Sequence, residues 1–193
     1  MAEQRKPRAD GVRNRVRVLE VAIEVFAAEG LSVPVHEIAR RAGVGTGTVG
    51  RHFPTKESLF EAIVHSVVER LTARADELSA KNDPGAAFFD FVASMVAEGA
   101  TNRALADALA GAGFDIDAAA STAGHDLGRV LAELLAAAQR VGAVRPDVDA
   151  ADVKAFLVGC AARERDGIDA AARDRMLAVI RDGLRPAKGR RVP

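Results

Sequence analysis

The stretch VHEIARRAGVGTGTVGRHF, residues 35–53, decides the fold. It begins with a helix predicted from about Val35 to Ala42, with Pro34 at the first position, where a missing N–H costs nothing and the fixed φ suits a helix. Gly43 follows at a point where the chain must adopt a positive φ, and Val44 can then enter the core between this helix and the next. The stretch therefore starts as a short helix that ends in a tight turn.

The second helix is predicted from about Thr46 to His52 and buries Val49 and Phe53, one helical turn apart. Small hydroxyl side chains near its N-terminal end, with a basic pair behind them, suit a helix whose first turn approaches base edges and phosphates in the major groove. The outward-facing candidates for DNA contact are Thr46, Gly47, Thr48, Gly50, Arg51 and His52. By itself, a helix–glycine–helix pattern is also typical of a solvated helical hairpin inside an all-α protein.

The sequence after this motif, PTKESLFEAIV at residues 54–64, favours the DNA-reading interpretation. Thr55 is expected to cap the next helix, and Glu57 lies in its first turn, near the positive end of the helix dipole. Lys56 stands beside the open N–H groups of that helix and is a candidate phosphate contact. Thr55 and Lys56 therefore join the candidate DNA-binding residues.

These residues resemble the DNA-binding domain of the TetR family of transcriptional regulators. The resemblance covers roughly residues 15–65 and rests on EVFAAEG at residues 24–30 and on the run from VHEIARRAG to FEAIV, which matches without a gap. It implies that His36, early in the first helix of the motif, also touches DNA. The chain departs from the family at Gly50, where Tyr or another phosphate-contacting side chain is usual, and at Gly45, where a Ser cap is common.

Length and composition predict an all-α protein. The 193 residues are 49% hydrophobic but only 4% aromatic, with no Trp or Tyr, and no alternating strand of five or more residues appears. Charges interrupt the apolar runs well short of the ~18 residues that a membrane span needs. The basic N-terminus is not followed by an apolar signal segment, and a single cysteine, Cys160, fits a reduced compartment as a small core residue. We therefore expect a cytoplasmic protein.

Charge is unevenly distributed, although the chain is neutral overall. Residues 1–57 hold 10 Lys and Arg against 7 Asp and Glu, and six of those basic residues lie in the first 17. Arg13, Arg15 and Arg17 then stand near the positive end of a helix predicted from about Asp10 or Asn14 to Gly30. These first 17 residues form a basic N-terminal arm. The arm either follows the phosphate backbone of DNA or is a solubilising tail.

The rest of the chain predicts a second helical domain. A long helix from Thr55 to about Ala80 is expected to link a DNA-binding domain, residues 11–70 with its motif at about 34–53, to a ligand-binding and dimerisation domain, residues 71–193. The turn NDPG at residues 82–85 is expected to end that helix. Further helices are predicted at residues 86–98, 102–110, 117–141, 150–165 and 169–184.

Family resemblance implies a homodimer. The last two helices each carry a wide apolar face that includes Val153, Phe156, Met176 and Ile180, and in the TetR family the corresponding helices pair with those of a second subunit. A two-fold dimer would place its two DNA-binding domains on a palindromic double-stranded DNA operator. Resemblance further implies a repressor that releases its operator when an unidentified small-molecule effector binds.

The sequence offers no constellation for catalysis. P-loop, GxSxG, HExxH and dinucleotide-binding patterns are absent, so we expect neither an enzyme nor a cofactor. Glu61 and His65 lie one helical turn apart and are interpreted as a pair of surface residues rather than as a metal site. Candidates for lining an effector pocket, with ordinary core packing as the alternative, are Phe88, Phe91, Phe114, His125, Arg129 and Phe156. A helical interaction or scaffold protein that keeps a non-specific DNA-binding head is the second hypothesis, supported by Gly45 and Gly50.

Overall fold

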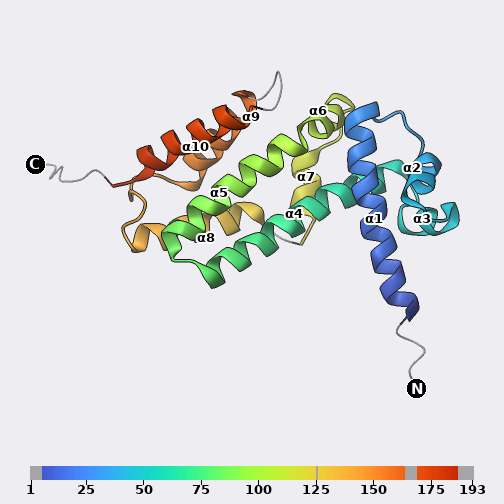
Figure 1. The fold of residues 1–193 in the computed structure, drawn as a ribbon, viewed down its shortest axis with the longest axis horizontal. Helices are drawn as coiled ribbons and strands as arrows, with labels where there is room; N and C mark the ends of the chain where they lie inside the picture. Colours follow the sequence, from blue (N-terminus) through green and yellow to red (C-terminus); the bar gives the residue numbers. More distant parts are fainter. Residues whose placement is uncertain (1–5, 125, 164–168, 187–193) are drawn as a thin grey trace, which may run out of the picture. The chain divides into compact units, whose positions relative to one another are not determined.

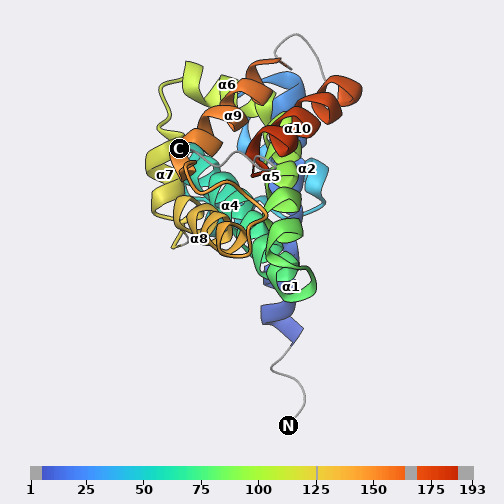
Figure 2. The same ribbon diagram turned by 90° about the vertical axis from the view of Figure 1, so that its left-hand side faces the viewer.

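The computed structural model describes residues 6–124, 126–163 and 169–186, with side chains from residue 10 onward, and every regular element in these ranges is a helix (Figures 1 and 2). This confirms the predicted all-α class. The helices are α1 (Lys6–Glu29), α2 (Val35–Ala42), α3 (Thr46–His52), α4 (Lys56–Lys81), α5 (Pro84–Thr101), α6 (Arg103–Gly111), α7 (Ile116–Ser121), α8 (Leu127–Arg140), α9 (Ala150–Arg163) and α10 (Ala170–Leu184).

The chain folds into two compact units. The first contains residues 1–67 and 102–124, and the second contains residues 68–101 and 125–193. The boundary falls inside α4, so this helix contributes to both units, as expected of a linking element. The units differ from the predicted domains 11–70 and 71–193 mainly at residues 102–124, because α6 and α7 belong with the N-terminal helices.

The first unit is built on one hydrophobic core. Helix α1 packs against α2, α3 and α6, and the ring of Phe60 on α4 lies edge-on to both Phe26 and Phe114, with centroids 5.4 and 5.8 Å apart. The buried face of α1 is centred on Val18, Ala22 and Val25, whereas Val16 of the same helix is exposed. Other fully buried side chains of this core include Ile38, Val49, Leu59 and Ile63.

The turn between α2 and α3 has the predicted geometry. Gly43 has φ +66°, and its N–H donates to Arg40 O at 3.2 Å. The N–H of Val44 donates to Ala39 O at 3.0 Å, and the Val44 side chain is buried as expected. Pro34, however, is the N-cap of α2 with φ −76° and ψ 148°, not its first helical residue. An extended ψ keeps Pro34 outside the helix while its carbonyl accepts from the N–H of Glu37 at 3.0 Å.

Two other helices begin at least two residues before the predicted position. Helix α1 begins at Lys6 rather than near Asp10 or Asn14, because Pro7 suits a first helical turn. Helix α5 begins at Pro84, because Asp83 Oδ1 accepts from the N–H groups of residues 85 and 86 at 3.0 and 3.1 Å and caps it; the NDPG turn is thus shorter than predicted.

The prediction of a single helix at residues 117–141 is wrong. The chain instead forms α7 and α8, which belong to different compact units. Gly124 adopts φ +74° between them, and Asp126 caps α8 by accepting from the N–H of Arg129 at 2.9 Å. The apolar periodicity of this stretch continues across a break that backbone conformation imposes.

The second unit buries the middle of α5. Helix α5 packs against α8 and α9, α8 packs against α9, and α9 packs against α10. Phe88 and Phe91 are fully buried, together with Leu131 of α8 and Val153 of α9. Within the described ranges, no helix has the length and apolar character needed to cross a membrane.

Two glycine substitutions test this description of the motif. Gly50→Ala should raise the free energy of unfolding by about 0.5–1 kcal/mol, since Gly50 lies inside α3 with open space where a Cβ would stand. Gly43→Ala should lower it by about 1–2 kcal/mol, because its positive φ disfavours a Cβ. Urea denaturation followed by circular dichroism measures both changes, and a destabilised Gly50→Ala protein would contradict the placement of Gly50.

Candidate nucleic-acid interface

Helix α3 presents the predicted polar face to solvent. Thr46, Gly47, Gly50, Arg51 and His52 are exposed and Thr48 is half-buried. On the opposite face Val49 and the adjoining Phe53 are almost completely buried, as the one-turn spacing predicted. The seven-residue helix is therefore held by its apolar side while its polar side stays open.

A recess of about 240 Å³ joins α3 to the two neighbouring helices. Its apolar lining includes Val49 and Phe53. Five of the nine predicted DNA-binding residues also line it, namely His36, Thr46, Gly50, Thr55 and Lys56. The structure thus brings residues from α2, α3 and the start of α4 to one surface, with Gly47, Thr48, Arg51 and His52 on the exposed helix beside it.

The start of α4 is fixed by a reciprocal pair of hydrogen bonds. The N–H of Ser58 donates to Thr55 Oγ1 at 3.0 Å, and the N–H of Thr55 donates to Ser58 Oγ at 3.1 Å. Thr55 caps the helix as predicted. Lys56 is the first residue of α4, and its Nζ lies 5.6 Å from the centroid of Phe26, so the core holds this ammonium at the recess.

The end of α3 that carries the basic pair is also restrained. Arg51 Nε donates to Gly47 O at 3.0 Å, which lays the arginine along its own helix. Arg15 of α1 places its guanidinium 5.9 Å from the centroid of Phe53, directly after α3. Sequence reasoning missed this contact, because it treated the arginines of α1 only as a charged arm. Residues 6–17 of that arm are helical rather than a tail.

An ion-pair network joins α2 to the end of α1. Glu37 accepts from Arg40 Nε at 2.7 Å and from Arg41 Nε at 2.8 Å, and Arg41 also pairs with Glu29. Hydrogen bonds from Arg40 first and Arg41 second lower the pKa of Glu37 to about 2. The helical spacing of Glu37, Arg40 and Arg41 could have revealed half of this network, whereas the Glu29 contact spans twelve residues of sequence.

The predicted effector-pocket residues do not come together. Phe114 belongs to the first unit, where it packs on Phe60, whereas Phe88 and Phe91 are core residues of the second. Arg129 is exposed and pairs with Glu133 at 2.5 Å. Phe156 is 41% exposed on α9, and His125 lies outside the described residues. The presence of several phenylalanines in the sequence could not show whether they line one pocket or belong to the cores of two separate units.

Helices α9 and α10 lie side by side (Figure 1). They line an open groove of about 600 Å³. Phe156, Met176, Val179 and Ile180 line it, and Val179 is 72% exposed. Val153 and Cys160 of α9 are instead buried. Part of the predicted apolar face therefore packs inside the subunit, and the rest remains open along the groove.

No cluster of three potential metal ligands occurs among the residues whose positions are described. His65 serves a structural contact within the first unit. Its Nε2 lies 3.0 Å from Ala119 O and 3.2 Å from Thr122 Oγ1, which connects α4 to α7. The residue is thus engaged with α7 rather than free on the surface.

Comparison with known proteins identifies the family. Residues 18–63 match the family model of bacterial regulatory proteins, tetR family, and residues 83–186 match that of the SbtR-like transcriptional regulator C-terminal domain, which covers more than half of the chain. The chain belongs to the TetR family. The matched families are transcriptional regulators and not enzymes.

Solved TetR structures extend the similarity over nearly the whole chain. A TetR transcription regulatory protein from Mycobacterium vanbaalenii is 50% identical, covers 93% of this chain and 99% of that one, and has a TM-score of 0.76. A TetR transcriptional regulator from Streptomyces coelicolor is 33% identical over 90% of this chain and 99% of that one, with a TM-score of 0.74.

Two curated relatives match over about a third of the chain. The HTH-type transcriptional regulator SrpR of Pseudomonas putida is 40% identical over 63 residues, which are 32% of this chain and 30% of SrpR. The match to the regulator LuxR of Vibrio harveyi covers 36% of that protein. This chain thus spans about a third of the length of these curated relatives.

The Glu37 network generates a pH prediction. Because the folded-state pKa of Glu37 is below its ordinary value of 4.5, its contribution to stability is complete above that pH and is lost as the pH falls toward 2. Glu37→Gln should lower the melting temperature at pH 7 but converge with the wild type near pH 2. Glu20→Gln, at an exposed position of α1, is the matched control. A constant difference between pH 7 and pH 2 would contradict the assignment.

Proposed function

We propose that this chain represses transcription in the cytoplasm by binding palindromic operator DNA as a homodimer, and that a small-molecule effector lowers its operator affinity. The observation that carries the DNA-binding part is the open polar face of α3 beside a recess lined by His36, Thr55 and Lys56. Family membership supports the same function.

The residues of the interface divide into two roles. Thr48 and Arg51 lie on α3, the helix that would enter the major groove, where a guanidinium can bind guanine and a threonine methyl or hydroxyl can contact a base edge. Lys56 and Thr55, at the first turn of α4, are placed to bind a backbone phosphate. His36 adds a donor from α2 on the same surface.

The groove between α9 and α10 supports a dimer interface. It exposes Phe156 and Val179, large apolar side chains whose burial against a second copy removes their surface from water. Gly159 and Gly183 also line it and leave the groove without bulk at those positions. A two-fold axis through this groove would present the same face on both subunits.

The effector part rests on family membership. Phe88 and Phe91 of α5, which packs against α8 and α9, remain the candidates for contacting an effector in the second unit. Because both rings are fully buried, a ligand that reaches them has to displace core packing. Such displacement would change the helix arrangement of this unit and offers a route to weaker operator binding.

A helical scaffold protein with a non-specific DNA-binding head remains the alternative. Gly45 caps α3 without a side-chain hydrogen bond, and Gly50 offers no side chain toward DNA. A scaffold of this kind would bind all duplexes alike, whereas an operator-binding regulator should prefer its site by about a thousand-fold or more.

DNA binding can be tested with variants of the two roles. Lys56→Ala should weaken binding to operator and unrelated DNA alike and reduce the salt slope by about 1. Thr48→Ala and Arg51→Ala should cost about 1–3 kcal/mol on the operator, provided that each side chain reads a base. Fluorescence anisotropy at several salt concentrations measures both effects. Unchanged binding by Lys56→Ala would remove the phosphate assignment.

The dimer interface can be tested by sedimentation. Phe156→Glu places a charge in the groove and should convert the dimer to monomers. Val141→Glu is the matched control, because Val141 is 58% exposed at the end of α8, outside the groove lining. A Phe156→Glu protein that stays dimeric would place the interface elsewhere.

A further inference from the structure

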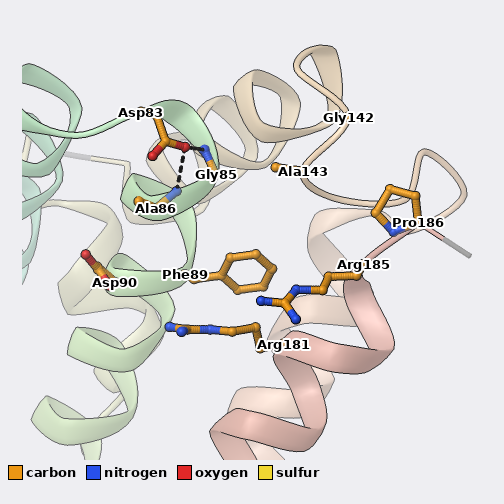
Figure 3. Close-up of a pocket in the computed structure, with 10 residues that line it drawn as sticks. All are labelled: Asp83, Gly85, Ala86, Phe89, Asp90, Gly142, Ala143, Arg181, Arg185 and Pro186. Carbon is orange, nitrogen blue, oxygen red and sulfur yellow. Dashed lines mark hydrogen bonds between the residues drawn. The ribbon is translucent and has the colours of Figure 1, made fainter. Parts of the chain in front are cut away.

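A second open pocket, of about 530 Å³, lies entirely within the second compact unit (Figure 3). Its walls are the start of α5, residues 142–143 after α8, and the end of α10. Its volume falls in the range of sites that bind small molecules. It shares no lining residue with the recess beside α3 or with the groove between α9 and α10, although α10 contributes different residues to this pocket and to that groove.

Two arginines meet one aromatic ring in this pocket. Arg181 lies in the last turn of α10 and Arg185 follows directly after that helix, and Figure 3 shows both side chains beside the Phe89 ring. The guanidinium of Arg181 is 5.3 Å from the ring centroid. Two positive charges that line the same pocket repel each other, so an anion between them would be stabilised.

The acidic side chains nearby are directed to other partners. Asp83 Oδ1 caps α5 by accepting from the N–H groups of residues 85 and 86. Asp90 accepts from Asn82 Nδ2 at 3.3 Å. Within the described part of the chain Arg181 has no ion pair, and Arg185 reaches only Asp182, which is outside the pocket lining, at 3.3 Å. The lining thus carries two carboxylates and two guanidiniums, but neither carboxylate forms an ion pair with Arg181 or Arg185 in the described part of the chain.

The apolar side of the pocket is firmly packed. Phe89 is half-buried and its ring lies 5.2 Å from that of Phe88, at 66° to it. A Cβ on Gly85 would stand 2.5 Å from Ala143 Cβ, so the start of α5 and the 142–143 segment approach each other as closely as glycine allows. A flat ligand could thus rest on a ring that the core holds in place.

From these observations we propose that this pocket binds a small organic anion with a carboxylate and a flat apolar body, an aromatic carboxylate being the simplest member of the class. The carboxylate would accept hydrogen bonds from Arg181 and Arg185, and the apolar body would lie on Phe89. The lining of this site includes neither Phe88 nor Phe91, and it shares no residue with the recess beside α3.

Fluorine NMR titration of the full chain with 4-fluorobenzoate tests the proposal. Binding should be saturable and at least tenfold weaker in Arg181→Gln, and similarly weaker in Phe89→Leu once circular dichroism shows that this variant is folded. Arg140→Gln, an exposed arginine at the end of α8, should bind like the wild type. The neutral analogue 4-fluorobenzamide should bind at least tenfold more weakly than the carboxylate.

Several results would overturn the proposal. The first is a failure to detect saturable binding of 4-fluorobenzoate. The second is equal affinity of Arg181→Gln and the wild type for 4-fluorobenzoate, and the third is equal affinity of the wild type for 4-fluorobenzamide and 4-fluorobenzoate. Displacement of the probe by equimolar inorganic phosphate would also overturn it, because it would show a site for any anion without a role for the ring. None of these results depends on DNA binding.

Discussion

The burial of Val49 and Phe53 beneath α3 is the contact on which the DNA-binding surface depends. A seven-residue helix that contains Gly47 and Gly50 cannot be stable by itself, since helix nucleation is costly and each glycine adds to the cost. Its two apolar anchors reach the core that α1, α2 and α4 share, so the polar face is positioned by packing on the opposite side. The reading surface is thus a consequence of the core.

Long polar side chains add a second layer of restraint to the same unit. Arg15 stands over the Phe53 ring, Lys56 over the Phe26 ring, and Arg41 joins Glu29 of α1 to Glu37 of α2. These contacts connect α1 to α2, to the residue after α3 and to the start of α4. They limit the freedom of α2 and α3 before DNA arrives, which reduces the ordering that binding must supply.

Local signals predicted the motif well and long-range contacts poorly. The bounds of α2 and α3 could be predicted from the spacing of apolar residues, and the turn from a glycine at position 43, which adopts the expected positive φ. Both signals come from residues that are close in sequence. The break between α7 and α8 was missed because apolar periodicity continues through Gly124, and α6 and α7 join the first unit through contacts distant in sequence. Phe114, which was predicted to line an effector pocket with Phe88 and Phe156, belongs to the first unit for the same reason.

The most direct test of the account is the ratio of affinities for specific and unrelated DNA. Genomic fragments selected by the purified chain would supply the specific duplex, and a scrambled duplex of equal length the reference, both at physiological salt. We predict a ratio of about a thousand or more, because we propose that Thr48 and Arg51 read bases from a helix that the core holds in place. Equal affinity for the two duplexes would contradict it.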